Sequence, residues 1–256
     1  PIPHIGSALR CRGQVLDTTK TLTYEIHLKE LGYDPEPYVL ADAVMYADGK
    51  RIVSFDHVSY RLVGLDEAAM RRSWMSQTDL PPWDRAPWGM PALDPEAPPA
   101  QNRPAIYDVE HIRAYAEGPP SQGFGPQYAP FDQDRILARL PRDPFLFVDR
   151  IVHLEPEPWV LKPGGWIEAE HEVPEDAWYF AANRSRSIPF AVLLEIALQP
   201  CGWLAAYLGS ALTSPQQLHF RNLEGEATLH RELRTDAGLL TVRVRLSGTN
   251  QAGGMI

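Results

Sequence analysis

Cysteine is scarce in this chain of 256 residues: only Cys11 and Cys201 occur, and they lie far apart. Two such cysteines have neither the spacing of a metal site nor the pattern of a disulfide framework. We therefore expect a reducing, cytoplasmic environment and no bound metal. Basic residues are also outnumbered, with 24 Lys and Arg against 33 Asp and Glu, for a net charge of −9. Because an acidic surface repels phosphate backbones, we do not expect nucleic acid as a partner.

An initiator methionine and a signal-peptide pattern are also lacking, since the chain begins at Pro1. We expect that further sequence precedes this residue. A single apolar run, 190–209, is about long enough to span a bilayer. We reject a membrane span because Glu195 and Gln199 lie inside the run, Pro200 interrupts it, and strand-like sequence follows. We expect instead a helix that protein buries on every side.

Residues 1–75 are predicted to be mainly β structure. Runs of β-branched and aromatic residues with partial alternation cover 8–15, 22–31, 38–46 and 51–63. Asp48 and Gly49 predict a two-residue hairpin turn, and 65–75 predicts a short helix. The region holds no helix long enough to complete a domain, and a few strands alone cannot bury a core. We expect the missing helix to come from elsewhere.

A connector follows at 76–106. Eight prolines fall between Pro81 and Pro104, which excludes helix and sheet interior and favours an extended segment. Trp83 and Trp88 would rarely occur in a solvated linker, so we expect the connector to lie along a domain surface.

The second unit is predicted to be 107–256. A short helix at 109–116 is followed by a Gly/Pro-rich loop that reaches Tyr128. The order after that loop is strand, strand, long apolar helix, strand, strand. The strand-like runs are 145–154, 165–173, 217–229 and 239–246. Compared with the first unit, this order predicts a second module that lacks its last strands.

Several segments resemble one family of enzymes. The run LPRDPFLFVDRIV at 140–152 resembles the opening strand of the bacterial β-hydroxydecanoyl-ACP dehydratase/isomerase family. The aromatic run WYF at 178–180 resembles the start of that family's active-site loop. In the first unit, similar resemblances occur at 12–15, 23–26 and 40–50.

A closer resemblance is to the tandem dehydratase region of polyunsaturated fatty acid synthases and related iterative polyketide synthases. It is carried by 124–132, 199–203 and 220–225. Together the two resemblances cover nearly the whole chain except the connector. They imply an α+β double hotdog, in which antiparallel sheets each wrap around a long central helix, with the first hotdog incomplete in this chain.

The implied activity is that of a lyase: dehydration of 3-hydroxyacyl-ACP thioesters to trans-2-enoyl thioesters in polyunsaturated fatty acid or polyketide biosynthesis. No cofactor is expected, because the substrate is carried on the phosphopantetheine of an acyl carrier protein. The expected partners are that carrier protein and other domains of the same synthase. Pairing between hotdogs, or a homodimer, is left open.

In such enzymes a histidine removes the α proton, a carboxylic acid helps the hydroxyl leave, and backbone N–H groups at the helix start polarise the thioester. The histidine is expected three residues after Phe180, where this chain has Asn183. Asparagine does not titrate and cannot be the base. None of the eight histidines occupies this position, and we interpret His171 as a surface residue at a strand end.

The resemblance places the acid at Glu195, six residues after Pro189, and a helix glutamine at Gln199. Residues four apart share one helix face. A buried carboxylate must be paired, protonated or facing a cavity. One interpretation is an acid of raised pKa that lines an acyl tunnel, and the other is a structural glutamate bonded to Gln199. Phe190 stands where the family has a glycine, which would hinder approach of a thioester to the helix start.

We therefore predict that the second hotdog supplies the acid side of a shared site, while its own loop at Asn183, Pro189 and Phe190 is degenerate. The base would come from sequence before Pro1, so this fragment alone should be inactive. Two alternatives stay open: a hotdog thioesterase, and a non-catalytic hotdog that completes and scaffolds a partner site. Arg184 and Arg186 could contact an acidic acyl carrier protein, but we favour the interpretation that they are solvated loop residues.

Overall fold

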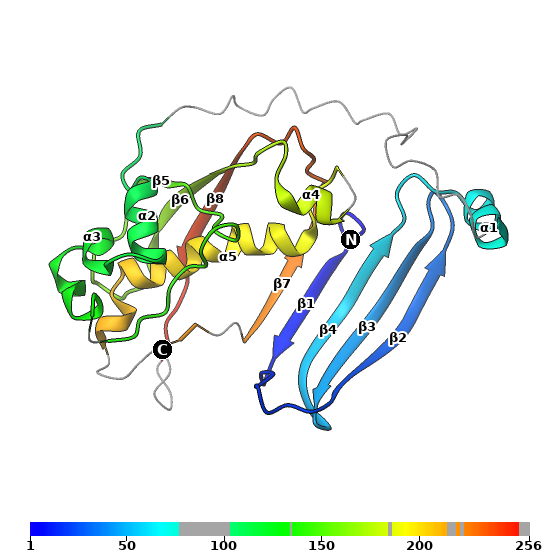
Figure 1. Cartoon of the computed structure of the whole chain (residues 1–256), viewed down its shortest axis with the longest axis horizontal. Coiled ribbons are helices and arrows are strands. Elements are labelled where there is room, and N and C mark those ends of the chain that lie inside the picture. Colours follow the sequence, from blue (N-terminus) through cyan, green and yellow to red (C-terminus); the bar gives the residue numbers. More distant parts are fainter. Residues whose placement is uncertain (77–102, 134, 184–185, 214–218, 221–222, 251–256) are drawn as a thin grey trace. The chain divides into compact units, whose positions relative to one another are not determined.

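Two separate antiparallel sheets organise the chain (Figure 1). The computed structural model describes residues 1–76, 103–133, 135–183, 186–213, 219–220 and 223–250. Unit 1 comprises Pro1–Glu96 with Arg221–Glu232, and unit 2 comprises Ala97–Phe220 with Leu233–Ile256. The proline-rich connector predicted at 76–106 falls almost entirely outside the described residues. Helices and antiparallel sheets together confirm the α+β class.

Unit 1 holds a five-stranded sheet in the order β2-β3-β4-β1-β7. Its strands are β1 (Gly6–Cys11), β2 (Leu22–Gly32), β3 (Tyr38–Ala47), β4 (Lys50–Arg61) and β7 (Glu224–Thr228). Asp48 and Gly49 have φ angles of 47° and 79°, and they close the β3–β4 hairpin as predicted. Helix α1 (Glu67–Ser76) follows β4, where a short helix was expected.

The two faces of this sheet differ in polarity because side chains alternate along each strand. One face carries exposed ion pairs such as Arg10 with Asp56 and Lys29 with Asp42. The opposite face is lined by aliphatic and aromatic side chains. On β2 these are 42–68% exposed: Leu22, Tyr24, Ile26, Leu28 and Leu31. Exposure on this scale is unusual for a soluble domain and indicates a surface built to be covered.

Strand β7 belongs to unit 1 although it follows the long helix in sequence. It pairs antiparallel with β1, from Gly6 opposite Thr228 to Arg10 opposite Glu224, and Figure 1 shows it beside β1. The predicted second unit of 107–256 included this strand, whereas the structure groups Arg221–Glu232 with unit 1. The local pattern identified a strand, but its pairing partner depends on backbone hydrogen bonds to residues more than 200 positions away.

Unit 2 combines a three-stranded sheet with the long helix α5 (Phe190–Tyr207), which runs across one face of that sheet (Figure 1). The strand order is β5-β6-β8, with bounds Arg150–Leu154, Gly164–Glu172 and Leu239–Leu246. The other helices are α2 (Val109–Ala116), α3 (Pro120–Phe124), η1 (Pro126–Phe131), α4 (Trp178–Asn183) and η2 (Ser210–Thr213). The core centres on Trp203, which is fully buried and stacks on Tyr207 with 5.2 Å between ring centroids.

The region predicted as a Gly/Pro-rich loop before Tyr128 is partly helical. It forms α3 and η1, and Tyr128 and Phe131 are buried in the core. The phenol O–H of Tyr128 donates to the Ala206 carbonyl, which ties η1 to α5. These short helices need tertiary contacts, because helices of five or six residues are not stable alone.

Helix α5 differs from its prediction in two ways. The helix continues through Pro200 and does not end there. Pro200 lies inside the helix and is buried. The helix is also not buried on every side, and this expectation was wrong: Ala191, Glu195, Leu198 and Cys201 are exposed. By length and composition α5 would suffice to cross a membrane, and less than half of it is buried in the structure. A single helix of this kind is weak support for a membrane span, since core helices pass the same test.

Candidate active site

The candidate site is built on the first turns of α5. Pro189 is the N-cap with extended backbone (φ −56°, ψ 140°), and Phe190 is the first helical residue. The Pro189 carbonyl accepts hydrogen bonds from the backbone N–H groups of Val192 (2.9 Å) and Leu193 (3.1 Å). The residues that follow are mostly Ala, Leu and Ile, and they favour continuation of the helix.

Glu195 and Gln199 lie one turn apart on α5, as their spacing predicted. The Gln199 amide nitrogen is 3.4 Å from a carboxylate oxygen of Glu195. Gln199 is buried, but Glu195 is exposed on the uncovered side of the helix. The expectation of a buried carboxylate is therefore not met in the structure, and Glu195 remains open to solvent or to a partner.

Both the oxygen and the nitrogen of the Gln199 side-chain amide form hydrogen bonds with the backbone of another segment. Its carbonyl oxygen accepts a hydrogen bond from the Phe147 N–H at 2.8 Å, and its amide nitrogen donates to the Phe145 carbonyl at 2.8 Å. These bonds join α5 to the segment before β5, over a sequence separation of more than 50 residues. Gln199 therefore positions this segment and the Glu195 carboxylate together.

An exposed aromatic pair joins this segment to α4 and was not predicted as part of the site. The rings of Phe145 and Trp178 are 52% and 39% exposed, and they meet edge to face with 5.0 Å between centroids. The indole N–H of Trp178 donates to the Pro144 carbonyl at 2.9 Å. Both aromatics belong to runs that carry the family resemblance, yet nothing in the sequence indicated that they meet beside Gln199.

Asn183 is the last residue of α4 and is exposed. Its carboxamide cannot accept a proton as a base does. Arg184 lies outside the described residues. Arg186 is exposed, and its backbone carbonyl accepts from the Thr235 N–H at 3.0 Å. The position of the family's histidine therefore holds no titratable group.

His171 was interpreted as a surface residue, and this was wrong. It is only 6% exposed, because it shares the inward face of β6 with Ile167 and Ala169. Its ring packs edge to face on Phe147, and its Nδ1 is 3.3 Å from a carboxylate oxygen of Asp149.

Burial acts to raise the pKa of Asp149, but His171 and the backbone N–H of Glu172 outweigh it, so the pKa lies below its ordinary value. Alternation did carry a signal for this orientation, because Ile167, Ala169 and Val173 share one strand face with His171, whereas Glu168, Glu170 and Glu172 occupy the other. The contacts of His171 identify it as part of the core of unit 2.

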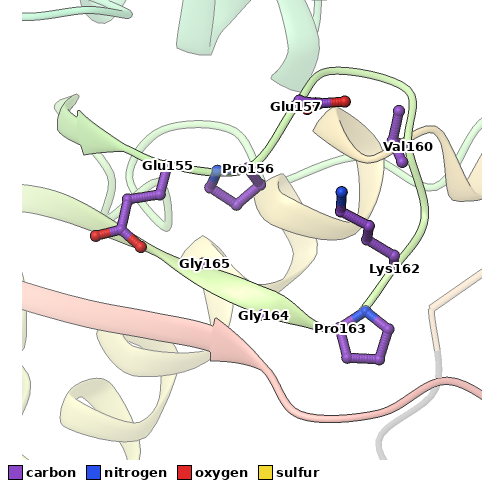
Figure 2. Close-up of a pocket in the computed structure, with 8 residues that line it drawn as sticks. All are labelled: Glu155, Pro156, Glu157, Val160, Lys162, Pro163, Gly164 and Gly165. Carbon is purple, nitrogen blue, oxygen red and sulfur yellow. The ribbon is translucent and has the colours of Figure 1, made fainter.

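A separate small pocket lies in the β5–β6 connection (Figure 2). Its volume is about 130 Å³, well below the range of ligand sites. Its lining consists of Glu155, Pro156, Glu157, Val160, Lys162, Pro163, Gly164 and Gly165. No predicted site residue lines it. Within the described parts of the chain, no three His, Cys, Asp or Glu side chains gather as metal ligands.

Comparison with known proteins agrees with the resemblance. Residues 3–56 match the FabA-like domain. The matched residues lie within unit 1. A 90-residue stretch is also 33% identical to one of the polyunsaturated fatty acid synthase subunits of Thraustochytrium sp. (strain ATCC 26185 / S-3). That alignment covers 35% of this chain and only 6% of the synthase polypeptide. The match to residues 3–56, together with the antiparallel sheets and helices, supports an α+β hotdog fold.

Proposed function

We propose that this chain contributes the acid side of a dehydratase site that removes water from 3-hydroxyacyl thioesters carried by an acyl carrier protein. The FabA-like match supports a dehydratase-type role in fatty acid biosynthesis. The partial match to a synthase polypeptide supports action within a larger multienzyme, with its neighbouring domains as partners. A cytoplasmic location is part of the proposal.

The observation that carries the proposal is the exposed Glu195 carboxylate, held by buried Gln199 on the uncovered side of α5. A general acid must reach the leaving hydroxyl, so it has to lie on an open surface or in a cavity. Exposure fits this role better than the alternative of a structural glutamate enclosed in the core. Asn183 supplies no base, so the base of a shared site would come from another hotdog.

The test is Glu195→Gln in the full tandem dehydratase region. Replacing the acid with an isosteric amide should lower the rate of 3-hydroxyacyl thioester dehydration by about 10²-fold or more. Glu175→Gln is the matched control, because Glu175 is also an exposed glutamate of unit 2. Unchanged dehydration in Glu195→Gln would contradict the proposal.

The thioesterase alternative is separated by the product. Hydrolysis releases a free thiol, whereas dehydration leaves the thioester intact and adds a conjugated double bond. Loss of thiol release in Glu195→Gln, with no enoyl product in the parent protein, would assign the chain to hydrolysis instead. Carrier protein binding without either product would indicate the scaffolding role.

A further inference from the structure

Phe145 and Trp178, called the aromatic pair below, are exposed yet firmly held. The backbone of Phe145 is fixed by two hydrogen bonds, to the Arg142 carbonyl at 2.8 Å and from Gln199, and its ring packs edge to face on Trp178. The Trp178 indole is anchored to the Pro144 carbonyl at 2.9 Å. Anchored side chains lose little conformational entropy when something binds to them, so exposed and fixed aromatics make an efficient contact surface.

The backbone of Phe145, which carries one ring of the aromatic pair, lies close to the candidate acid. One amide nitrogen of Gln199 donates both to the Phe145 carbonyl at 2.8 Å and to the Glu195 carboxylate at 3.4 Å. Because both bonds start from the same nitrogen, the Phe145 carbonyl oxygen and the Glu195 carboxylate oxygen must lie close to each other. Leu198, also 39% exposed, lies three residues after Glu195 on the open side of α5. The Glu195 carboxylate thus has Leu198 close by on its own helix, and the backbone of Phe145 is linked to it through Gln199.

We infer that the aromatic pair binds the acyl chain of the thioester and sets the preference for its length. The inference rests on the proposed function, because it assumes that the reacting carbons lie at Glu195. Carbons beyond the hydroxyl-bearing one then reach the exposed apolar side chains around Glu195, of which the two rings of the aromatic pair are the largest. A linear apolar chain suits two rings beside a single carboxylate, whereas an anionic membrane surface would be repelled by that charge.

The energetic consequence is a dependence on chain length. Each methylene that moves from water onto an apolar surface raises affinity about fourfold when it is fully buried. Two partly exposed rings can cover only a few methylenes, so the preference for a long chain over a short one should be limited to those few positions. Removing either ring should reduce this preference without removing the site.

The experiment measures binding of a short and a long 3-hydroxyacyl pantetheine thioester to the full tandem region. In the parent protein, the long thioester should bind more tightly and shift the indole N–H resonance of Trp178, assigned by its loss in Trp178→Phe. Phe145→Ala and Trp178→Ala should weaken the long thioester several-fold more than the short one. Trp178→Phe keeps a ring but loses the anchor to Pro144, so its effect should be smaller.

Trp166→Ala is the matched control, because Trp166 is 38% exposed on β6 of the same unit and packs on Arg245 instead. It should leave the length preference unchanged. The inference is overturned if Phe145→Ala retains the full length preference, if both thioesters weaken equally, or if the variant changes only the oligomeric state. The readout here is binding, whereas the proposed function is tested by turnover in Glu195→Gln, so the two tests can fail separately. An altered length preference in the ring variants together with unchanged dehydration in Glu195→Gln would refute the proposed function alone.

Discussion

Replacing Gln199 with alanine should disconnect α5 from the segment before β5. The side chain is 4% exposed, and its carbonyl oxygen satisfies the N–H of Phe147, a residue that is also 4% exposed. A buried N–H left without a partner costs about 1–3 kcal/mol. The Phe145 carbonyl belongs to an exposed residue, so water can replace the amide there at little cost. Adding the lost side-chain packing, we expect destabilisation of about 2–3 kcal/mol.

The most direct assay is hydrogen exchange at the Phe147 amide, because it reports the broken bond itself and not the average of two units. A loss of about 2 kcal/mol corresponds to roughly 30-fold faster exchange if the amide opens locally. Chemical denaturation of the same variant should show a lower midpoint with a similar slope.

Two controls separate the causes. Gln199→Met keeps the side-chain volume but removes both hydrogen bonds. If the bonds matter more than packing, this variant should be destabilised nearly as much as Gln199→Ala. Glu195→Ala removes only the weaker exposed contact and should change stability by about 0.5 kcal/mol or less. Unchanged protection of the Phe147 amide in Gln199→Ala would refute the reasoning.

Two further predictions concern unit 2. Trp203→Ala should destabilise the unit by about 3–5 kcal/mol, because a fully buried indole that stacks on Tyr207 leaves a cavity; the denaturation midpoint checks this, and a change below about 1 kcal/mol would contradict it. Acid should also destabilise the unit, because two of its carboxyl groups have lowered pKa values. The pKa of Asp149 is lowered as described above, and that of Glu168 is lowered by hydrogen bonds from Arg103, the larger effect, and from Arg243. A carboxyl group with a lowered pKa stabilises the folded state at pH values above its ordinary pKa, which is about 4. This stabilisation is lost as the pH falls through the pKa of the folded state. Asp149→Asn should reduce the pH dependence of the denaturation midpoint below about pH 5, and an unchanged dependence would contradict this assignment.

Local features of the chain were largely predictable from the sequence. Helix Val109–Ala116 and strand Leu239–Leu246 have the predicted bounds, and the Asp48–Gly49 turn closes a hairpin. The spacing of Glu195 and Gln199 already placed them on one helix face, because helical periodicity depends only on nearby residues. The strand predicted at 145–154 is shorter, since Phe145 and Phe147 are bound by Gln199 instead of a neighbouring strand.

The sequence by itself determined several elements, including helix Val109–Ala116 and strand Leu239–Leu246, and which pair of polar residues shares a turn of α5. Only the tertiary structure decided that β7 pairs with β1, that Glu195 is open and that the rings of Phe145 and Trp178 meet. The physical reason is sequence separation. Periodicity and turn chemistry act over a few residues, whereas burial and pairing depend on groups tens to hundreds of residues apart, which no local pattern specifies.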